Sequence, residues 1–149
     1  MIVLDASCVV SLLRGEAGQA DVVAALTHEC AMSVLNRAEV IDRLSRHGAS
    51  VDDVAADLDT LGITFIALDV DTADRAAGLR AKHYHRIECP LSMADCVALA
   101  TALATDATLA TSDAHLAAIV RANGCAVVPV ANSAGVYPPT NVLPEMGVR

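Results

Sequence analysis

Apolar positions along the chain alternate between short continuous runs and stretches with helical spacing. The short runs, several of them rich in β-branched residues, predict buried strands. The longer stretches predict amphipathic helices; in 51–61, for example, apolar residues lie on one side and four aspartates on the other. The predicted strands are 2–4, 30–33, 63–68, 107–110 and 126–130, and the predicted helices are 8–13, 21–28, 34–46, 51–61, 72–84, 92–104 and 112–123. Strands that alternate with helices predict a mainly parallel five-stranded sheet covered on both faces.

The length and composition indicate a single domain with a core of small side chains. The chain has 149 residues, which suits one core better than two. Hydrophobic residues make up 54% of it, mostly Ala, Val and Leu, and such side chains let helices pack closely on a sheet. No internal repeat or linker is present. We expect one domain over residues 1–130 and an irregular tail over 131–149 that contains three prolines, Pro138, Pro139 and Pro144.

Neither a membrane segment nor a disulfide framework is predicted. No apolar stretch approaches the roughly 18 to 20 residues needed to cross a bilayer. The N-terminus has an acid at its fifth position and no basic region before its apolar residues, so it does not resemble a signal peptide. The five cysteines are odd in number and form no C-x-x-C motif, which favours a reduced compartment and makes a zinc site improbable. We therefore expect a cytoplasmic protein.

Acidic residues follow two of the predicted strands. Asp5 ends the first strand, and Asp113 comes shortly after the fourth. The carboxyl ends of parallel strands meet at one edge of a sheet, where binding sites form near a topological switch point. Two further acids lie on helices: Asp95 on a nearly all-apolar helix, and Glu39 on the helix after the second strand.

Each of these acids also has a purely structural interpretation. Asp5 or Ser7 could cap the first helix, and Ser112 with Asp113 could cap the last. Asp95 stands three residues after Ser92, which is the spacing of a capping box. Glu39 could form a surface ion pair with Arg43 at i,i+4.

The acids taken together favour a cation site over four separate structural roles. Carboxylates about 5 Å apart would repel by roughly 3 kcal/mol per pair at an effective dielectric near 20. Such a cluster either takes up protons or binds a cation. Because only oxygen ligands are offered, the fitting ion is Mg²⁺ or Mn²⁺.

The chain resembles the PIN-domain nucleases, specifically the VapC toxins of bacterial toxin–antitoxin pairs. The resemblance rests on four segments in order, Ile2–Ser7, Ser33–Glu39, Leu91–Ala102 and Leu109–Asp113. It implies a three-layer α/β/α fold and an endoribonuclease that uses Mg²⁺ or Mn²⁺. It also implies a homodimer that is inhibited by a small DNA-binding antitoxin.

The resemblance also assigns roles to individual residues. Asp5, Glu39, Asp95 and Asp113 match the family's acidic positions, and would therefore be the catalytic, metal-site carboxylates. Ser7 and Thr111 match its hydroxyl positions and would orient carboxylates or metal waters. The expected reaction is in-line hydrolysis of an RNA phosphodiester by a metal-activated water, leaving a 5′-phosphate and a 3′-hydroxyl. The sequence offers no convincing histidine pair for the alternative chemistry through the 2′-hydroxyl.

The net charge of −8 is unusual for a protein that binds RNA, since phosphate contacts favour a basic surface. Part of this charge belongs to the predicted site. Positive residues gather between 75 and 86, where Arg75, Arg80, Lys82 and Arg86 are the candidate phosphate contacts, although a solvated helix face explains them equally well. With few aromatic residues available for stacking, recognition of a folded RNA such as a transfer or ribosomal RNA is favoured.

Three kinds of competing interpretation arise, and the sequence disfavours the first, an enzyme or receiver domain with a nucleophilic or phospho-accepting aspartate. Phosphohydrolases with a nucleophilic aspartate would show D-x-D after the first strand, but Asp5 is followed by Ala6 and Ser7. Receiver domains would require a lysine on a late strand, and the segment 108–112 has none. The chain could also be a catalytically inactive PIN-like binding module, or a housekeeping RNA-processing nuclease.

Overall fold

A five-stranded sheet forms the centre of the molecule in the computed structural model, which describes residues 1–140. The strands are β1 (Ile2–Leu4), β2 (Cys30–Ser33), β3 (Thr64–Ile66), β4 (Thr108–Thr111) and β5 (Val127–Pro129). All neighbouring pairs are parallel, in the order β3-β2-β1-β4-β5. The predicted parallel α/β architecture is therefore confirmed.

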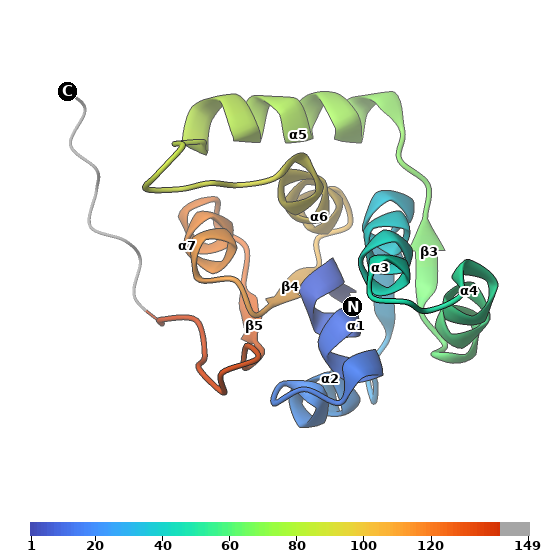
Figure 1. The fold of residues 1–149 in the computed structure, drawn as a ribbon. Coiled ribbons are helices and arrows are strands. Elements are labelled where there is room, and N and C mark those ends of the chain that lie inside the picture. Colours follow the sequence, from blue (N-terminus) through green and yellow to red (C-terminus); the bar gives the residue numbers. More distant parts are fainter. Residues whose placement is uncertain (141–149) are drawn as a thin grey trace.

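Helices cover both faces of the sheet and make three layers (Figure 1). One face carries α1 (Ala6–Arg14), α2 (Gln19–Ala25), α3 (Val34–Arg46) and α4 (Val51–Thr60). The other carries α6 (Met93–Ala104) and α7 (Ala114–Ala122), with α5 (Val70–His83) packed against α6. Successive strand residues point to opposite faces, so fully buried Val3 and Leu4 belong to different cores.

The strand order reverses between β1 and β4. The chain leaves β1 and adds β2 and then β3 on one side, after which it returns and places β4 on the other side of β1. Leu4 of β1 is paired with Ala110 of β4, so the residues that follow these two strands lie next to each other. This position is the topological switch point of the sheet, where open α/β folds place their sites.

Side-chain caps set where several helices begin. Asp5 accepts a hydrogen bond from the Cys8 backbone N–H at 3.1 Å, so α1 begins at Ala6, and the prediction of a start at Cys8 with Ser7 as the cap is wrong. Asp69 likewise accepts from the Thr72 N–H at 2.8 Å and starts α5 two residues earlier than predicted. Ser50 Oγ accepts from the Asp53 N–H at 3.4 Å, and α4 begins at Val51, as predicted. An aspartate before an apolar run can cap at its own position, and spacing alone does not reveal which candidate does so.

The remaining boundaries differ by a few residues. The third strand is half its predicted length, because the chain after Ile66 turns toward α5. The fourth strand begins and ends one residue later than predicted, and this shift makes Thr111 part of the sheet. All five cysteines are buried and unpaired, as their apolar surroundings predicted. Within residues 1–140, no helix is both long and apolar enough to cross a bilayer.

Residues 131–140 fold back over α2. The carboxylate of Asp21 on α2 accepts hydrogen bonds from the Ala131 N–H at 3.0 Å and from the Tyr137 hydroxyl at 3.1 Å. The rest of the predicted tail, residues 141–149 with Pro144, lies outside the described residues. At Gly18 the backbone at residues 130–131 comes so close that a Cβ would stand less than 3 Å from the Ala131 carbonyl oxygen and 2.8 Å from Val130 Cγ1.

Replacing Gly18 with alanine is expected to destabilise the protein by about 1–3 kcal/mol, because backbone must shift to admit the methyl group. Gly78→Ala is the matched control, since a Cβ at Gly78 meets nothing within 4 Å and alanine favours a helix over glycine by about 1 kcal/mol. Chemical denaturation of both variants measures the difference. If Gly18→Ala and Gly78→Ala had equal free energies of unfolding, residues 131–140 would not pack against Gly18.

Candidate active site

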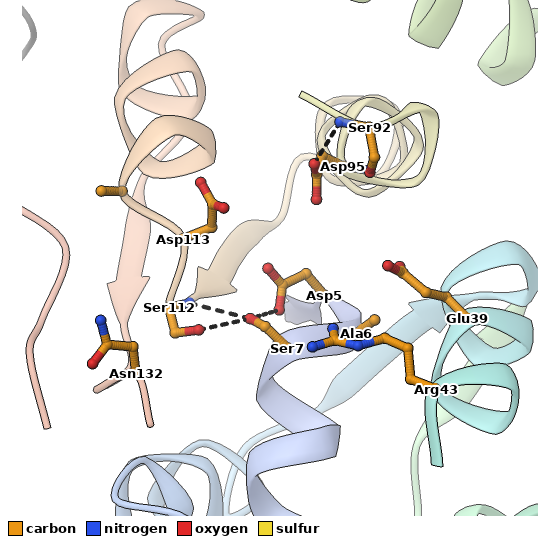
Figure 2. Close-up of a pocket in the computed structure, with 11 residues that line it drawn as sticks. Asp5, Ala6, Ser7, Glu39, Arg43, Ser92, Asp95, Ser112, Asp113 and Asn132 are labelled. Carbon is orange, nitrogen blue, oxygen red and sulfur yellow. Dashed lines mark hydrogen bonds between the residues drawn. The ribbon is translucent and has the colours of Figure 1, made fainter. Parts of the chain in front are cut away.

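Four carboxylates from four different elements line one hollow of about 470 Å³. Asp5 follows β1, Asp113 follows β4, and Glu39 and Asp95 come from α3 and α6. Figure 2 shows Asp95 and Glu39 pointing toward Asp5, with Asp113 beside them. The structure thus brings together all four acids that the sequence analysis singled out.

Asp5 is the most enclosed of the four, with only 3% of its surface exposed. Its Oδ1 accepts hydrogen bonds from the Ser7 hydroxyl at 2.6 Å and the Cys8 N–H at 3.1 Å. Its Oδ2 accepts from the Thr111 hydroxyl at 2.5 Å. Burial raises the pKa of Asp5 above its ordinary value, and the hydrogen bonds from Ser7 and Thr111 work against that rise. The carboxylate is therefore held in one orientation by partners from β4 and α1.

A chain of hydroxyl groups links the ends of β1 and β4. The Ser112 hydroxyl donates to Ser7 Oγ at 3.0 Å, and Ser7 in turn donates to Asp5 (Figure 2). The Asp113 N–H donates to Thr111 Oγ1 at 3.0 Å. Ser7 and Thr111 thus contact the central carboxylate, and each can fix its position.

Asp95 is both a helix cap and a wall of the hollow. Its Oδ2 accepts from the Ser92 N–H at 2.8 Å while its own N–H donates to Ser92 Oγ at 3.0 Å, which is a complete capping box. Burial raises the pKa of Asp95 most, hydrogen bonds from Ser92 lower it, and the negative charges of Asp5 and Asp113 raise it further. The structural interpretation of Asp95 is thus correct and does not exclude a role in the site.

Asp113 and Glu39 complete the lining. Asp113 caps α7 by accepting from the Leu116 N–H at 2.8 Å, and its side chain is exposed. Glu39 is half-buried, and this burial is the main cause of its raised pKa. The charges of Asp95 and Asp5 raise the pKa of Glu39 further, whereas Arg43 lowers it. The alternative of a surface pair is not realised, because none of the ion pairs within residues 1–140 joins Glu39 to Arg43.

The donor set of this hollow fits a hydrated hard cation. It offers carboxylate oxygens, and burial is the main cause of the raised pKa of three of the four acids, Asp5, Glu39 and Asp95. Within residues 1–140, however, no three His, Cys, Asp or Glu side chains are grouped closely enough to ligate one ion together. Mg²⁺ commonly binds through one or two carboxylates and keeps several waters, so the hollow suits Mg²⁺ better than an ion that requires a closed cage.

Sequence reasoning missed two lining residues. Arg43 was considered only as a surface partner, although its i,i+4 spacing from Glu39 places both side chains on one face of α3. Asn132 comes from the segment after β5 and also lines the hollow. No sequence signal marks Asn132, because its position depends on how the chain folds back.

The basic residues between 75 and 86 do not line this hollow. Arg80 donates through Nε to the Leu91 carbonyl at 3.0 Å, and its guanidinium lies 4.3 Å from the centre of the Tyr84 ring. Arg75, Lys82 and Arg86 are exposed on α5 or just beyond it. Their contact with RNA stays a prediction, and Arg80 already has a structural role.

The sequence model of the PIN domain family matches residues 2–122 of the chain. No curated protein sequence matches it.

Solved structures with similar folds come from several bacteria. VapC20 from Mycobacterium tuberculosis, described as a sarcin–ricin loop cleaving toxin, has a TM-score of 0.67 and 17% identity, covering 79% of this chain and 94% of that one. FitAcB from Neisseria gonorrhoeae has a TM-score of 0.64 and 20% identity, covering 91% and 100%. A toxin–antitoxin complex from Klebsiella pneumoniae has a TM-score of 0.62 and 19% identity, covering 78% and 90%. At such identities these similarities show a shared fold.

Proposed function

Since the chain belongs to the PIN domain family, we propose that it is a Mg²⁺- or Mn²⁺-dependent endoribonuclease and the toxin of a toxin–antitoxin pair. The observation that carries the proposal is the convergence of Asp5, Glu39, Asp95 and Asp113 on one hollow at the switch point of the sheet. Asp5 and Asp113 would lie near each other as caps alone, because they follow the neighbouring strands β1 and β4. Asp95 and Glu39 come from α6 and α3, however, and neither a cap nor a surface pair requires their side chains to face the same hollow.

The four carboxylates would hold the cation, and the chain's other groups would position them. When bound, a divalent cation activates water and stabilises the leaving oxygen of a phosphodiester. Thr111 and Ser7 hold Asp5 in one orientation, so little reorganisation of this carboxylate is needed during the reaction. Ser92 does the same for Asp95. We propose hydrolysis that leaves a 5′-phosphate and a 3′-hydroxyl.

The structural neighbours support the biological part of the proposal. One is described as a toxin that cleaves the sarcin–ricin loop, and another as a toxin–antitoxin complex. We propose that this chain also cleaves a folded RNA, forms a homodimer, acts in the cytoplasm and is inhibited by a small antitoxin. A neighbouring gene for a short, basic, DNA-binding protein would support the pairing, and light scattering of the purified chain tests the dimer.

The proposed activity is tested by incubating purified protein, free of any partner, with total cellular RNA in Mg²⁺, Mn²⁺ or EDTA. We expect discrete fragments with the metals and none with EDTA, and mapping of their ends would identify the RNA and show 5′-phosphates. Fragments that end in a 2′,3′-cyclic phosphate and form without metal would overturn the mechanism. Folded protein that neither cleaves RNA nor binds metal would instead support an inactive binding module.

A further inference from the structure

A second hollow of about 310 Å³ adjoins the acidic one. The two share four lining residues, Ser7, Arg43, Ser112 and Asn132, so they form one continuous groove. The shared wall includes the hydroxyl chain that supports Asp5. Beyond this wall the charge of the lining changes sign, because among residues 1–140 two arginines, Arg14 and Arg43, line the second hollow against one acid, Glu16.

Arg43 is the cation best placed to meet a ligand in this groove. It is partly buried, it lines both hollows, and Figure 2 shows its side chain extending from α3 toward Ser7. None of the ion pairs within residues 1–140 includes Arg43, and its guanidinium makes no hydrogen bond there. Arg14 is different, since its Nε lies 3.4 Å from Glu16 Oε1.

A buried hydroxyl in the same hollow also lacks a partner. Ser11 of α1 lines the second hollow and is only 3% exposed. Within the described part of the chain its Oγ has no hydrogen-bond partner. A buried polar group without a partner is costly, and proteins generally satisfy such groups with another residue, a water or a ligand. The Ser11 Oγ has almost no accessible surface, and a Cβ on Gly18 would stand 2.9 Å from it, so it faces the start of α2 beneath the hollow and does not itself contact a ligand there.

We infer that the second hollow binds a phosphate of the RNA backbone next to the phosphate that is cleaved, and that Arg43 is its main contact. The inference rests on the proposed function. A guanidinium that no carboxylate holds in a direct ion pair can donate two parallel hydrogen bonds to phosphate oxygens, and backbone contacts of this kind set the register of a nucleic acid without reading its sequence. The groove thus offers an RNA strand a cation-binding end and a phosphate-binding end. It also explains how a chain with a net charge of −8 can hold RNA locally.

The test compares Arg43→Gln with Arg46→Gln. Arg46 lies on the same helix but pairs with Asp42 at 3.0 Å and lines neither hollow, so its substitution removes the same charge outside the groove. Binding of a labelled RNA hairpin with a single-stranded loop of about 12 nucleotides is followed by fluorescence anisotropy between roughly 50 and 200 mM salt. Ca²⁺ replaces Mg²⁺, and a gel after each titration confirms that the RNA is intact.

Arg43→Gln is expected to bind the RNA about tenfold more weakly than the wild type. The slope of log K against log salt is expected to become shallower by about 0.7, which corresponds to one phosphate contact on a single strand. Arg46→Gln should match the wild type both in its affinity for the RNA and in the slope of log K against log salt.

Two results would overturn the inference while leaving the nuclease in place. The first is that Arg43→Gln binds RNA with the affinity and the salt dependence of the wild type. The second is that Arg43→Gln loses cleavage without losing binding, which would show that Arg43 acts through Glu39. Failure of the proposed function looks different, because the wild type itself would then neither bind the RNA nor cleave cellular RNA with Mg²⁺.

Discussion

Replacing Asp95 with asparagine is expected to reduce metal-dependent RNA cleavage by at least about 10²-fold without unfolding the protein. The substitution removes one of the charges that would hold the cation, and loss of one preorganised electrostatic group commonly costs 10²- to 10³-fold in rate. The asparagine oxygen can still accept the hydrogen bond from the Ser92 N–H, which Asp95 Oδ2 accepts at 2.8 Å. The change therefore separates the charge of Asp95 from its role as a cap. Fragment yield over time, measured with Mn²⁺, gives the rate.

Asp69→Asn is the matched control for this experiment. Asp69 also caps a helix, but it lies at the start of α5 and does not line the hollow. Asparagine caps a helix about as well as aspartate, so this variant should keep both its fold and its cleavage rate. Asp5→Asn and Asp113→Asn should behave like Asp95→Asn. If all four variants cleaved RNA at the wild-type rate, the three aspartates in the hollow would be caps and nothing more.

Without divalent cations, the acids of the hollow are expected to make the protein more stable as the pH falls from neutral toward their ordinary pKa values of 3.8 and 4.5. Burial raises the pKa values of Asp5 and Asp95 above their ordinary 3.8 and that of Glu39 above 4.5, and their mutual repulsion adds to the rise for Glu39 and Asp95. The folded state therefore binds more protons than the unfolded state between the ordinary and the raised pKa values. The stabilisation is complete below the ordinary values and is lost as the pH rises through the raised ones. Thermal unfolding in EDTA at a series of pH values measures this change.

The gain in stability at lower pH should come from the carboxylates of the hollow. Among the residues that the structure describes, Arg43 is the one cation that lines this hollow beside the four acids, and it lowers the pKa of Glu39 in part. Asp95→Asn removes one of the repelling charges, so this variant should be more stable than the wild type at pH 7 in EDTA and should gain less on acidification. A wild-type stability that falls steadily from pH 7 to pH 5 would contradict the prediction.

Divalent cations, like protons, should stabilise the folded protein by neutralising the carboxylates of this hollow. At a free concentration about a hundredfold above its dissociation constant, a bound ion stabilises the folded state by about 2.7 kcal/mol, or several degrees in Tm. The increase should be larger at pH 7 than at pH 5, because protons compete for the same carboxylates. An equal increase at both pH values, or in Asp95→Asn, would place the cation elsewhere.

Much of the fold could be predicted because its signals are local. The predicted limits of α3 and α4 agree with the structure to within one residue, because apolar spacing and the cap at Ser50 act within one or two helical turns. The cap at Ser33 was not predicted, since this residue was assigned only to the second strand. Boundaries were wrong where two capping candidates stood close together, as at Asp5 and Ser7. There the choice depends on which side chain is drawn away by tertiary partners, and Ser7 donates to Asp5 and contacts Ser112 instead of capping α1.

The sequence by itself determined that the acids at the strand ends would share one edge, because all strands of a parallel sheet present their carboxyl ends on the same side. It could not determine that β1 and β4 are neighbours, which places the Thr111 hydroxyl against Asp5, 106 positions away. Nor could it reveal the unpaired guanidinium of Arg43, since a helical face is defined locally but its partners are not. Contacts between distant segments depend on the order of the strands and on the packing of helices over them, so only the tertiary structure decided how the site is built.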